Sequence, residues 1–363
     1  MLQEFGFQFD PFTHLDSTKD ARLYEYLVIP KTVEIAWGDE PAAILAQPGG
    51  GKSALRAYTE QVYRGTRGVK LPITYTPEDY SEESQFHFLG LQRAFARALL
   101  IYLVSYPDVF LQLPTEYQSR TKSLLSFLPY DFDFLLSVLE GTDSVGEMEQ
   151  LLGVNALSGI QKIGEAHQSM TRQLRTLPAA SIHSPDVEIL LSHAREIFEI
   201  DAFHILIDGL DGFPETTQPE SLIRWLTPLL ELAGAWKKKK VYIKFFLPVS
   251  MAEFPKIARH RDIRVATLNW DDGLLAEVIR RRLYVATQGA FDSLDAISAP
   301  DLRNVELHLA RQLNAEQKLP RQIILKTRRL LERTQQNTDG VIRYEDVFEE
   351  AREIGRASCR ERV

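Results

Sequence analysis

Hydrophobic residues along this chain form short unbroken runs that alternate with longer stretches of helical periodicity. The runs at 41–47, 71–76, 202–208 and 241–249 have the length of buried strands, and a shorter run follows at 264–268. Between these runs, apolar residues recur every three or four positions, as Leu55, Tyr58 and Val62 do, which predicts helices. We expect these helices at 53–64, 81–102, 184–198 and 219–236.

The alternation of strand and helix predicts an α/β fold, in which helices wrap a parallel sheet. Two regions depart from the alternation. The segment from about 107 to 184 has helical spacing with Pro and Gly breaks and no predicted strand, which indicates a helical insertion. From Asp272 onward the pattern is helical throughout, which indicates a small C-terminal helical domain. Its helices are expected at 273–288, 301–314 and 320–336.

These patterns divide the chain into four parts. We expect an N-terminal segment that packs on the core, a core domain that contains the insertion, a C-terminal helical domain and a short tail. Their bounds are 1–30, 31–272, 273–353 and 354–363.

Composition excludes several classes of protein. The chain has 363 residues, of which 44% are hydrophobic and 25% charged, as in a folded globular protein rather than a disordered one. The longest apolar run, at 98–104, is far shorter than the roughly 20 residues of a membrane span, and the first residues lack the basic start of a secretory signal. One cysteine allows no internal disulfide framework. We therefore expect a cytoplasmic protein with no membrane contact.

The tail contains that single cysteine, Cys359. Its sequence, IGRASCRERV at 354–363, matches the translation of a common short-read sequencing adapter, so we interpret it as read-through rather than native protein. The alternative is a natural arginine-rich tail. Without these residues the chain would have no cysteine, and its formal charge of −8 would become −10. Either charge argues against a protein that coats nucleic acid by bulk attraction.

A phosphate-binding motif lies between the first predicted strand and the helix that follows it. Small residues there allow successive backbone N–H groups to surround a polyphosphate, and the start of the helix adds its positive dipole end. The lysine of such a motif reaches the β- and γ-phosphates, and the following hydroxyl ligates Mg²⁺. The alternative is a chance glycine-rich turn. The candidate cofactor-binding residues are Ala46, Gln47, Pro48, Gly49, Gly50, Gly51, Lys52, Ser53 and Ala54.

Two aspartates follow the third predicted strand. Asp208 comes directly after the apolar run 203–207, at the edge of the sheet where such folds bind ligands, and it could hold Mg²⁺ together with Ser53. Asp211 could orient or deprotonate an attacking water. The alternative for Asp208 is a simple turn, because Asp-Gly is a turn former.

With these motifs the chain resembles the additional-strand P-loop ATPases, namely the AAA+ class and its signalling relatives, the STAND ATPases. The string LIDGLD at 206–211 resembles the STAND form of the second motif. AAA+ enzymes usually have Glu directly after the metal-binding Asp, where this chain has Gly209. STAND proteins often have an acidic residue where this chain has Gly212. Both departures imply slow turnover or a nucleotide-gated switch.

The resemblance implies further site residues. Ser250, which closes FFLPVS, matches the polar residue that senses the γ-phosphate, although it could also be a simple helix cap. Arg321 in LPRQIIL matches the second sensor, which projects from a helical lid to the phosphates, against the alternative of an ordinary surface arginine. Trp270 would pack that lid. An arginine finger could be supplied by Arg259, Arg261 or Arg264, and a surface loop is the simpler interpretation of each.

Other chemistry is less well supported. The histidines show no metal-binding spacing, and no native cysteine is expected, so we do not expect zinc. Three basic clusters, at 237–240, 280–282 and 328–329, could contact nucleic acid, but a solvated face is the simpler interpretation. The chain lacks the Asn-Lys-x-Asp string of guanine-specific pockets, which favours adenine.

The sequence therefore predicts an ATP-binding protein that uses Mg²⁺, Lys52, Asp211, Arg321 and Ser250 in a slow hydrolysis reaction to drive conformational change or assembly. We expect self-association or a partner protein bound through the helical insertion. Two alternatives remain: a nucleotide-binding signalling scaffold with negligible turnover, and a DNA-associated ATPase of the origin-recognition or transposition type.

Overall fold

A computed structural model of the chain describes residues 5–65, 70–81, 85–129, 131–140, 145–153, 156–157, 163–181, 186–336 and 340–348. The interpretation of 354–363 as read-through concerns residues outside these ranges. The chain divides into two compact units. The larger unit contains 34–45 and 55–267, and the smaller unit contains 1–33, 46–54 and 268–363.

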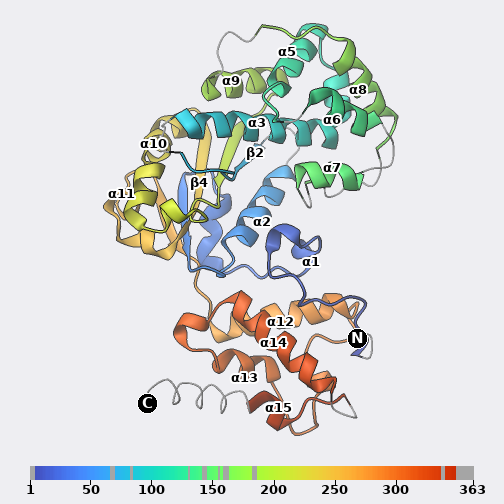
Figure 1. The fold of residues 1–363 in the computed structure, drawn as a ribbon, viewed down its shortest axis with the longest axis vertical. Helices are drawn as coiled ribbons and strands as arrows, with labels where there is room; N and C mark the ends of the chain where they lie inside the picture. The colour runs from blue at the N-terminus through green and yellow to red at the C-terminus, as the bar shows by residue number, and fades with distance from the viewer. Residues whose placement is uncertain are drawn as a thin grey trace. The chain divides into compact units, whose positions relative to one another are not determined.

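The larger unit is built on a five-stranded parallel sheet, which confirms the predicted α/β class. The strand order is β2-β3-β4-β1-β5, as in Rossmann-like and P-loop-like folds (Figure 1). In register, Phe203 of β3 lies between Leu71 of β2 and Val241 of β4. The strands are β1 (Ala42–Ala46), β2 (Lys70–Tyr75), β3 (Ala202–Ile207), β4 (Val241–Pro248) and β5 (Arg264–Thr267).

Helices cover both faces of the sheet, which is why its central strands are apolar at almost every position. Residues such as Ile205 share one core with α3 (Gln85–Ser105) and α10 (Pro219–Lys238). The alternate residues face α2 (Lys52–Arg64), where the Tyr63 ring stacks on the His204 ring with centroids 3.7 Å apart. Helix α2 therefore packs on the face opposite to α3 and α10.

By length and composition, α3 is the one helix in the described part of the chain that could cross a membrane, through Phe86–Ser105. The side chains of this stretch are 61% buried inside the protein. Core helices of globular proteins often share this composition.

The region after α3 is helical, and no strand occurs among its described residues up to 181, as the sequence predicts. Figure 1 shows α5, α6, α8 and α9 gathered on the far side of α3 from the strands. Leu124, Leu136 and Leu174 belong to the same apolar core as Ile205, so the insertion extends that core. Its helices are α4 (Pro107–Leu111), α5 (Thr115–Leu125), α6 (Phe132–Glu140), α7 (Val145–Leu152) and α8 (Glu165–Thr176), followed by α9 (Val187–Phe198). The short α11 (Pro255–Ala258) precedes β5.

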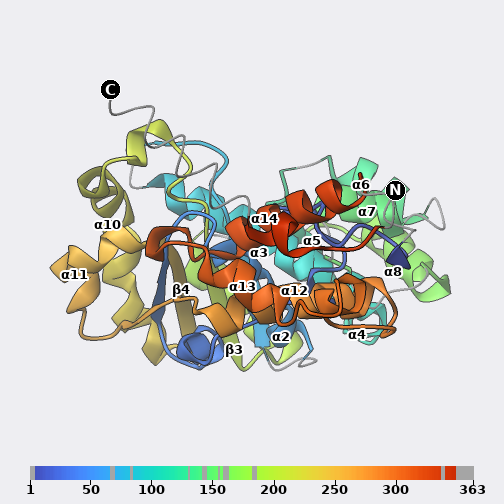
Figure 2. The same ribbon diagram turned by 90° about the horizontal axis from the view of Figure 1, so that it is seen from below.

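The smaller unit combines the two ends of the described chain. The sequence analysis placed the N-terminal segment on the nucleotide-binding core. In the structure, Phe5, Phe7 and Phe12 share an apolar core with the C-terminal helices, because these helices supply the apolar faces that cover them. Figure 2 shows α12, α13 and α14 lying together. The helices of this unit are α1 (Leu23–Tyr26), α12 (Asp272–Ala286), α13 (Val305–Arg311), α14 (Pro320–Thr334) and α15 (Tyr344–Phe348).

A buried arginine fastens the N-terminal segment to α12. The Arg282 guanidinium bonds to the backbone carbonyl of Pro11 and lies 4.2 Å from the ring centroid of Tyr26. Asp20 is 3.9 Å away, and its carboxylate also accepts from the Tyr26 hydroxyl. Arg282, a member of the basic cluster at 280–282, thus has a structural role.

A fully buried lysine lies on β4. Nζ of Lys244 donates hydrogen bonds to the backbone carbonyls of Ile35, Gly38 and Glu40, at 2.8, 2.7 and 2.5 Å. These bonds attach the segment before β1 to the underside of the sheet. Burial lowers the pKa of Lys244 from 10.5 to about 7, and the carboxylates of Asp39 and Glu40 oppose that shift only in part.

The depressed pKa of Lys244 predicts a pH-dependent stability. Between pH 7 and 10.5 the unfolded chain keeps a proton on this lysine that the folded chain has released. The free energy of unfolding should therefore rise with pH in that window, by up to about 1.4 kcal/mol per pH unit from this group. Urea unfolding at pH 7 and pH 9 should show a larger rise in wild type than in Lys244→Met. Equal rises in the two proteins would contradict the assignment.

Candidate functional site

The predicted phosphate loop connects the end of a buried strand to the start of a helix. β1 ends at Ala46 and α2 begins at Lys52. Gly49 and Gly51 have φ angles of +78° and +95°, which side chains with a Cβ rarely adopt. A Cβ on Gly50 would lie 2.9 Å from the backbone oxygen of Gln47, whose carbonyl accepts the Gly50 amide at 2.9 Å. The loop therefore needs glycine at three successive positions, each for a local steric reason.

The residues that flank these glycines differ in exposure. Ala46 and Gly50 are buried, whereas Gln47 and Pro48 are exposed. Lys52 is only 9% exposed, although lysines are rarely buried. Ser53 and Ala54 are half-buried in the first turn of α2, where backbone N–H groups have no partner within the helix. The loop thus combines a largely buried lysine with the first turn of a helix, which are features that anion binding uses.

Two residues of the C-terminal part of the chain, Trp270 before α12 and Arg321 on α14, contact the predicted phosphate loop within the smaller unit. The indole N–H of Trp270 donates to the backbone oxygen of Gly50 at 2.9 Å. Arg321 is exposed on the first turn of α14, and its Cβ and Cδ are 3.3 Å from the position that a Cβ on Gly49 would occupy. The sequence analysis proposed Arg321 for this place. It expected only lid packing from Trp270, because a hydrogen bond to a backbone carbonyl leaves no sequence signal.

Asp208 lies directly after β3 and is buried. Its Oδ1 accepts the Gly209 amide at 2.9 Å, and its Oδ2 is 3.7 Å from Nε of Arg56. β1 and β3 are parallel strands of one sheet and end at the same edge, and β4 lies between them. Asp208 leaves β3 at this edge.

Arg56 was not among the predicted site residues. Its Nη1 is 2.6 Å from Oε2 of Glu60, and the other Glu60 oxygen pairs with Arg64. Burial alone would raise the pKa of Glu60, but the guanidinium groups of Arg64, Arg56 and Arg97 outweigh it and hold the pKa below its usual value. The four-residue spacing of Arg56, Glu60 and Arg64 is visible in the sequence and could have indicated this row of charges.

The structure gives a physical reason for Gly209 where AAA+ enzymes have glutamate. Gly209 has a φ of +77°, and a Cβ on it would lie 2.8 Å from Cγ2 of Thr76. A glutamate therefore does not fit at 209 without a shift of the backbone or of Thr76. Asp211 is half-buried in the turn that follows, which the Gly212 amide closes onto the Gly209 carbonyl at 3.2 Å.

Ser250 is exposed in the 3₁₀ turn η5 (Val249–Glu253) that follows β4, the strand between β1 and β3. Of the arginine-finger candidates, Arg264 pairs with Glu40 at 2.8 Å and Arg261 lies 3.8 Å from Asp262. No described contact of Arg259 supports or opposes a role as an arginine finger.

The basic clusters are locally paired with acids. Lys239 and Lys240 pair with Glu188 and Asp201, and Arg281 bonds to Glu277 at 2.9 Å. Arg328 bonds to Glu332 at 2.9 Å. This pairing reduces the positive surface that nucleic acid would need. Within the described ranges, no three His, Cys, Asp or Glu side chains gather as a metal-binding group.

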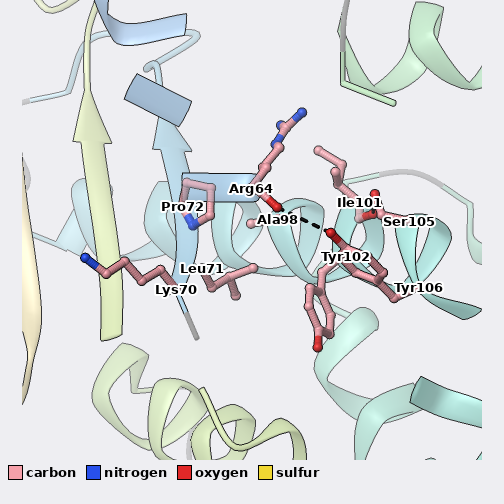
Figure 3. Close-up of a pocket in the computed structure, with 9 residues that line it drawn as sticks. All are labelled: Arg64, Lys70, Leu71, Pro72, Ala98, Ile101, Tyr102, Ser105 and Tyr106. Carbon is pink, nitrogen blue, oxygen red and sulfur yellow. Dashed lines mark hydrogen bonds between the residues drawn. The ribbon is translucent and has the colours of Figure 1, made fainter. Parts of the chain in front are cut away.

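A small hollow lies at the opposite edge of the sheet, beside the amino end of β2 and the carboxyl end of α3 (Figure 3). Its enclosed space is about 30 Å³, enough for one water molecule. The Tyr106 hydroxyl donates to the Arg64 carbonyl at 3.4 Å across one side of it. The hollow is too small for a nucleotide.

No protein-family model matches this chain, and no curated protein or solved structure matches it either. The fold and the local geometry therefore carry the functional argument.

The contact between Gly209 and Thr76 yields a stability prediction. Gly209→Ala should lower the free energy of unfolding by about 1–3 kcal/mol, because it combines an unfavourable φ with a steric clash. Gly146→Ala on α7 is the matched control, since nothing lies within 4 Å of its added Cβ. Urea unfolding should show no loss, or a gain of up to about 1 kcal/mol, in that control. Equal stability of Gly209→Ala and wild type would refute the steric argument.

Proposed function

We propose that this protein is an ATP-binding switch of the AAA+/STAND type that hydrolyses ATP slowly. The observation that carries the proposal is the phosphate loop. Three glycines, two with positive φ and one too close to the Gln47 carbonyl for a Cβ, lie between a buried strand and a helix, and a buried lysine follows them. A cradle of this kind is a general solution for polyphosphate binding.

The sheet supports the same proposal. One strand, β4, separates the strand that precedes the phosphate loop from the strand that precedes Asp208. The additional-strand ATPases, which this sequence resembles, take their name from such a strand. The contacts of Trp270 and Arg321 with the loop agree with a helical lid that responds to nucleotide.

The residues present fit Mg²⁺ and ATP. Backbone N–H groups of the loop other than that of Gly50, which donates to the Gln47 carbonyl, would hold the phosphates, and Lys52 would neutralise their charge. The hydroxyl of Ser53 and the carboxylate of Asp208 are the hard oxygen donors that Mg²⁺ prefers. When bound, the ion would stabilise charge on the phosphate oxygens.

Three further residues would act on the reaction. Asp211 would position or deprotonate the attacking water. Ser250 would contact the γ-phosphate from the end of β4. Arg321 would link the nucleotide state to the C-terminal helices, because its side chain already lies against Gly49.

A second candidate function is a signalling scaffold that binds nucleotide with negligible turnover. The contact between Gly209 and Thr76 favours it, because a glutamate at this position, as AAA+ enzymes have, would require a shift of the backbone or of Thr76.

Binding and hydrolysis separate the two functions. Wild type should bind Mg²⁺·ATP, and Lys52→Ala should weaken binding by about 10- to 100-fold, the worth of a charged hydrogen bond. Asp211→Asn should retain binding and slow hydrolysis by at least about 100-fold. Lys238→Ala, which removes an exposed lysine, is the control and should behave as wild type. Tight binding with equal, near-zero rates in wild type and Asp211→Asn would favour the scaffold, and no binding by wild type would end both proposals.

The Trp270 hydrogen bond offers a separate test. Trp270→Phe keeps an aromatic ring but removes the N–H that Gly50 accepts, so ATP affinity should fall by about 2- to 10-fold. Trp236→Phe is the matched control, because it removes an indole N–H bond to Glu188 in the larger unit. Titration with a fluorescent ATP analogue should show weaker binding only in Trp270→Phe. Unchanged affinity in that variant would remove Trp270 from the site.

A further inference from the structure

A row of buried charges runs along one face of α2 from Asp208 toward the helical insertion. Arg56, Glu60 and Arg64 are spaced by four residues, so their side chains share a face. Glu60 lies between the two arginines and pairs with both. The exposed fractions of these three side chains are only 12%, 14% and 20%. The charges therefore interact in a medium where water screens them weakly.

One end of this row meets Asp208. The 3.7 Å between Nε of Arg56 and Oδ2 of Asp208 is an ion-pair distance but too long for a hydrogen bond. Nε of Arg56 is buried and has no hydrogen-bond partner among the described residues. A buried N–H without a partner costs about 1–3 kcal/mol, so this contact is under-satisfied on the arginine side.

The other end of the row lies near the carboxyl end of α7. Nη1 of Arg64 donates to the backbone oxygen of Ala156 at 2.6 Å, and Figure 3 shows the guanidinium pointing away from the small hollow. Arg97 of α3 donates to the backbone oxygen of Leu152, the last residue of α7. Cations at these carbonyls also complement the negative dipole end of α7. Arg64 and Arg97 thus connect the end of α7 and the residues just after it to α2 and α3.

We propose that Arg56 is a positioning residue whose guanidinium interacts with both Asp208 and Glu60. Through these two interactions it couples the binding of a cation at Asp208 to the packing of α7. This inference rests on the proposed function. A divalent cation at Asp208 repels the nearby guanidinium, which then pairs more closely with Glu60. The ion pair between Glu60 and Arg64 then weakens, and so does the hydrogen bond from Arg64 to the Ala156 carbonyl. Binding at the phosphate edge therefore loosens α7.

A purely structural row of charges makes a different prediction. In that case, removal of Arg56 would loosen α7 to the same extent with and without nucleotide. The distinguishing readout is therefore the response of α7 to nucleotide, measured in the full chain.

Hydrogen exchange with mass spectrometry provides this readout, with Mg²⁺ and a slowly hydrolysed ATP analogue as the probe. In wild type, amides of α7 should exchange about 2- to 5-fold faster when the probe is bound. This change corresponds to the free energy that one ion pair contributes. Arg56→Gln should still bind the probe but show no such response. It should also need several-fold less Mg²⁺ for half-saturation, because a competing cation near Asp208 is gone. Arg175→Gln is the control: it removes an arginine that pairs with Glu140 within the insertion, and it should respond as wild type does.

A second variant covers the case in which Arg56→Gln does not fold. Arg64→Gln should raise α7 exchange without the probe to the level that wild type reaches with it, and the probe should add nothing further.

The outcomes separate this inference from the proposed function. Probe binding by wild type without a change at α7 would overturn the inference and leave ATP binding intact. A persistent α7 response in Arg56→Gln or Arg64→Gln would also overturn it. No probe binding by wild type would overturn both proposals.

Discussion

The constraint on which the rest of the site depends is steric and lies in the backbone between β1 and α2. The chain must leave a buried strand, reverse within five residues and start a helix. Gly49 and Gly51 take left-handed conformations, and Gly50 approaches the Gln47 carbonyl too closely for a side chain. Because the loop has no side chains at these positions, its backbone is open to the contacts that Trp270 and Arg321 make. One short segment therefore determines both the candidate phosphate cradle and its connection to the C-terminal helices.

The second constraint is the parallel sheet, which determines where Asp208 lies. β1 and β3 are parallel strands of one sheet, so both end at the same edge of it. On the face of α2, buried charges then continue from Asp208 through Arg56 and Glu60 to Arg64, which bonds to the chain just after α7. The insertion shares its apolar core with the sheet. The proposed switch thus has a packed core that gives it rigidity and a row of charges that can respond to a ligand.

Sequence periodicity was sufficient for the fold because parallel strands are buried on both faces and appear as unbroken apolar runs. The strands β1 to β5 and the helices α10, α12 and α14 lie within about two residues of their predicted positions. The glycine-rich turn between β1 and α2 was also visible, since glycine has few substitutes where φ is positive. What the sequence could not show depends on contacts between distant segments. The Trp270 bond to Gly50 involves a backbone carbonyl, and Thr76 excludes a side chain at 209 only because β2 and β3 are neighbours. The N-terminal phenylalanines were recognisable as core residues, but their partners on α12 to α14 were not.

The most direct test of the central claim is calorimetric titration of Mg²⁺·ATP into the full chain and into Gly50→Ala. The account predicts saturable binding of about one nucleotide per chain to wild type. It also predicts a loss of affinity in Gly50→Ala, whose circular dichroism spectrum should stay that of a folded α/β protein, because the added Cβ disturbs the cradle where it meets the Gln47 carbonyl. No heat of binding with wild type, or equal affinity in the two proteins, would contradict it.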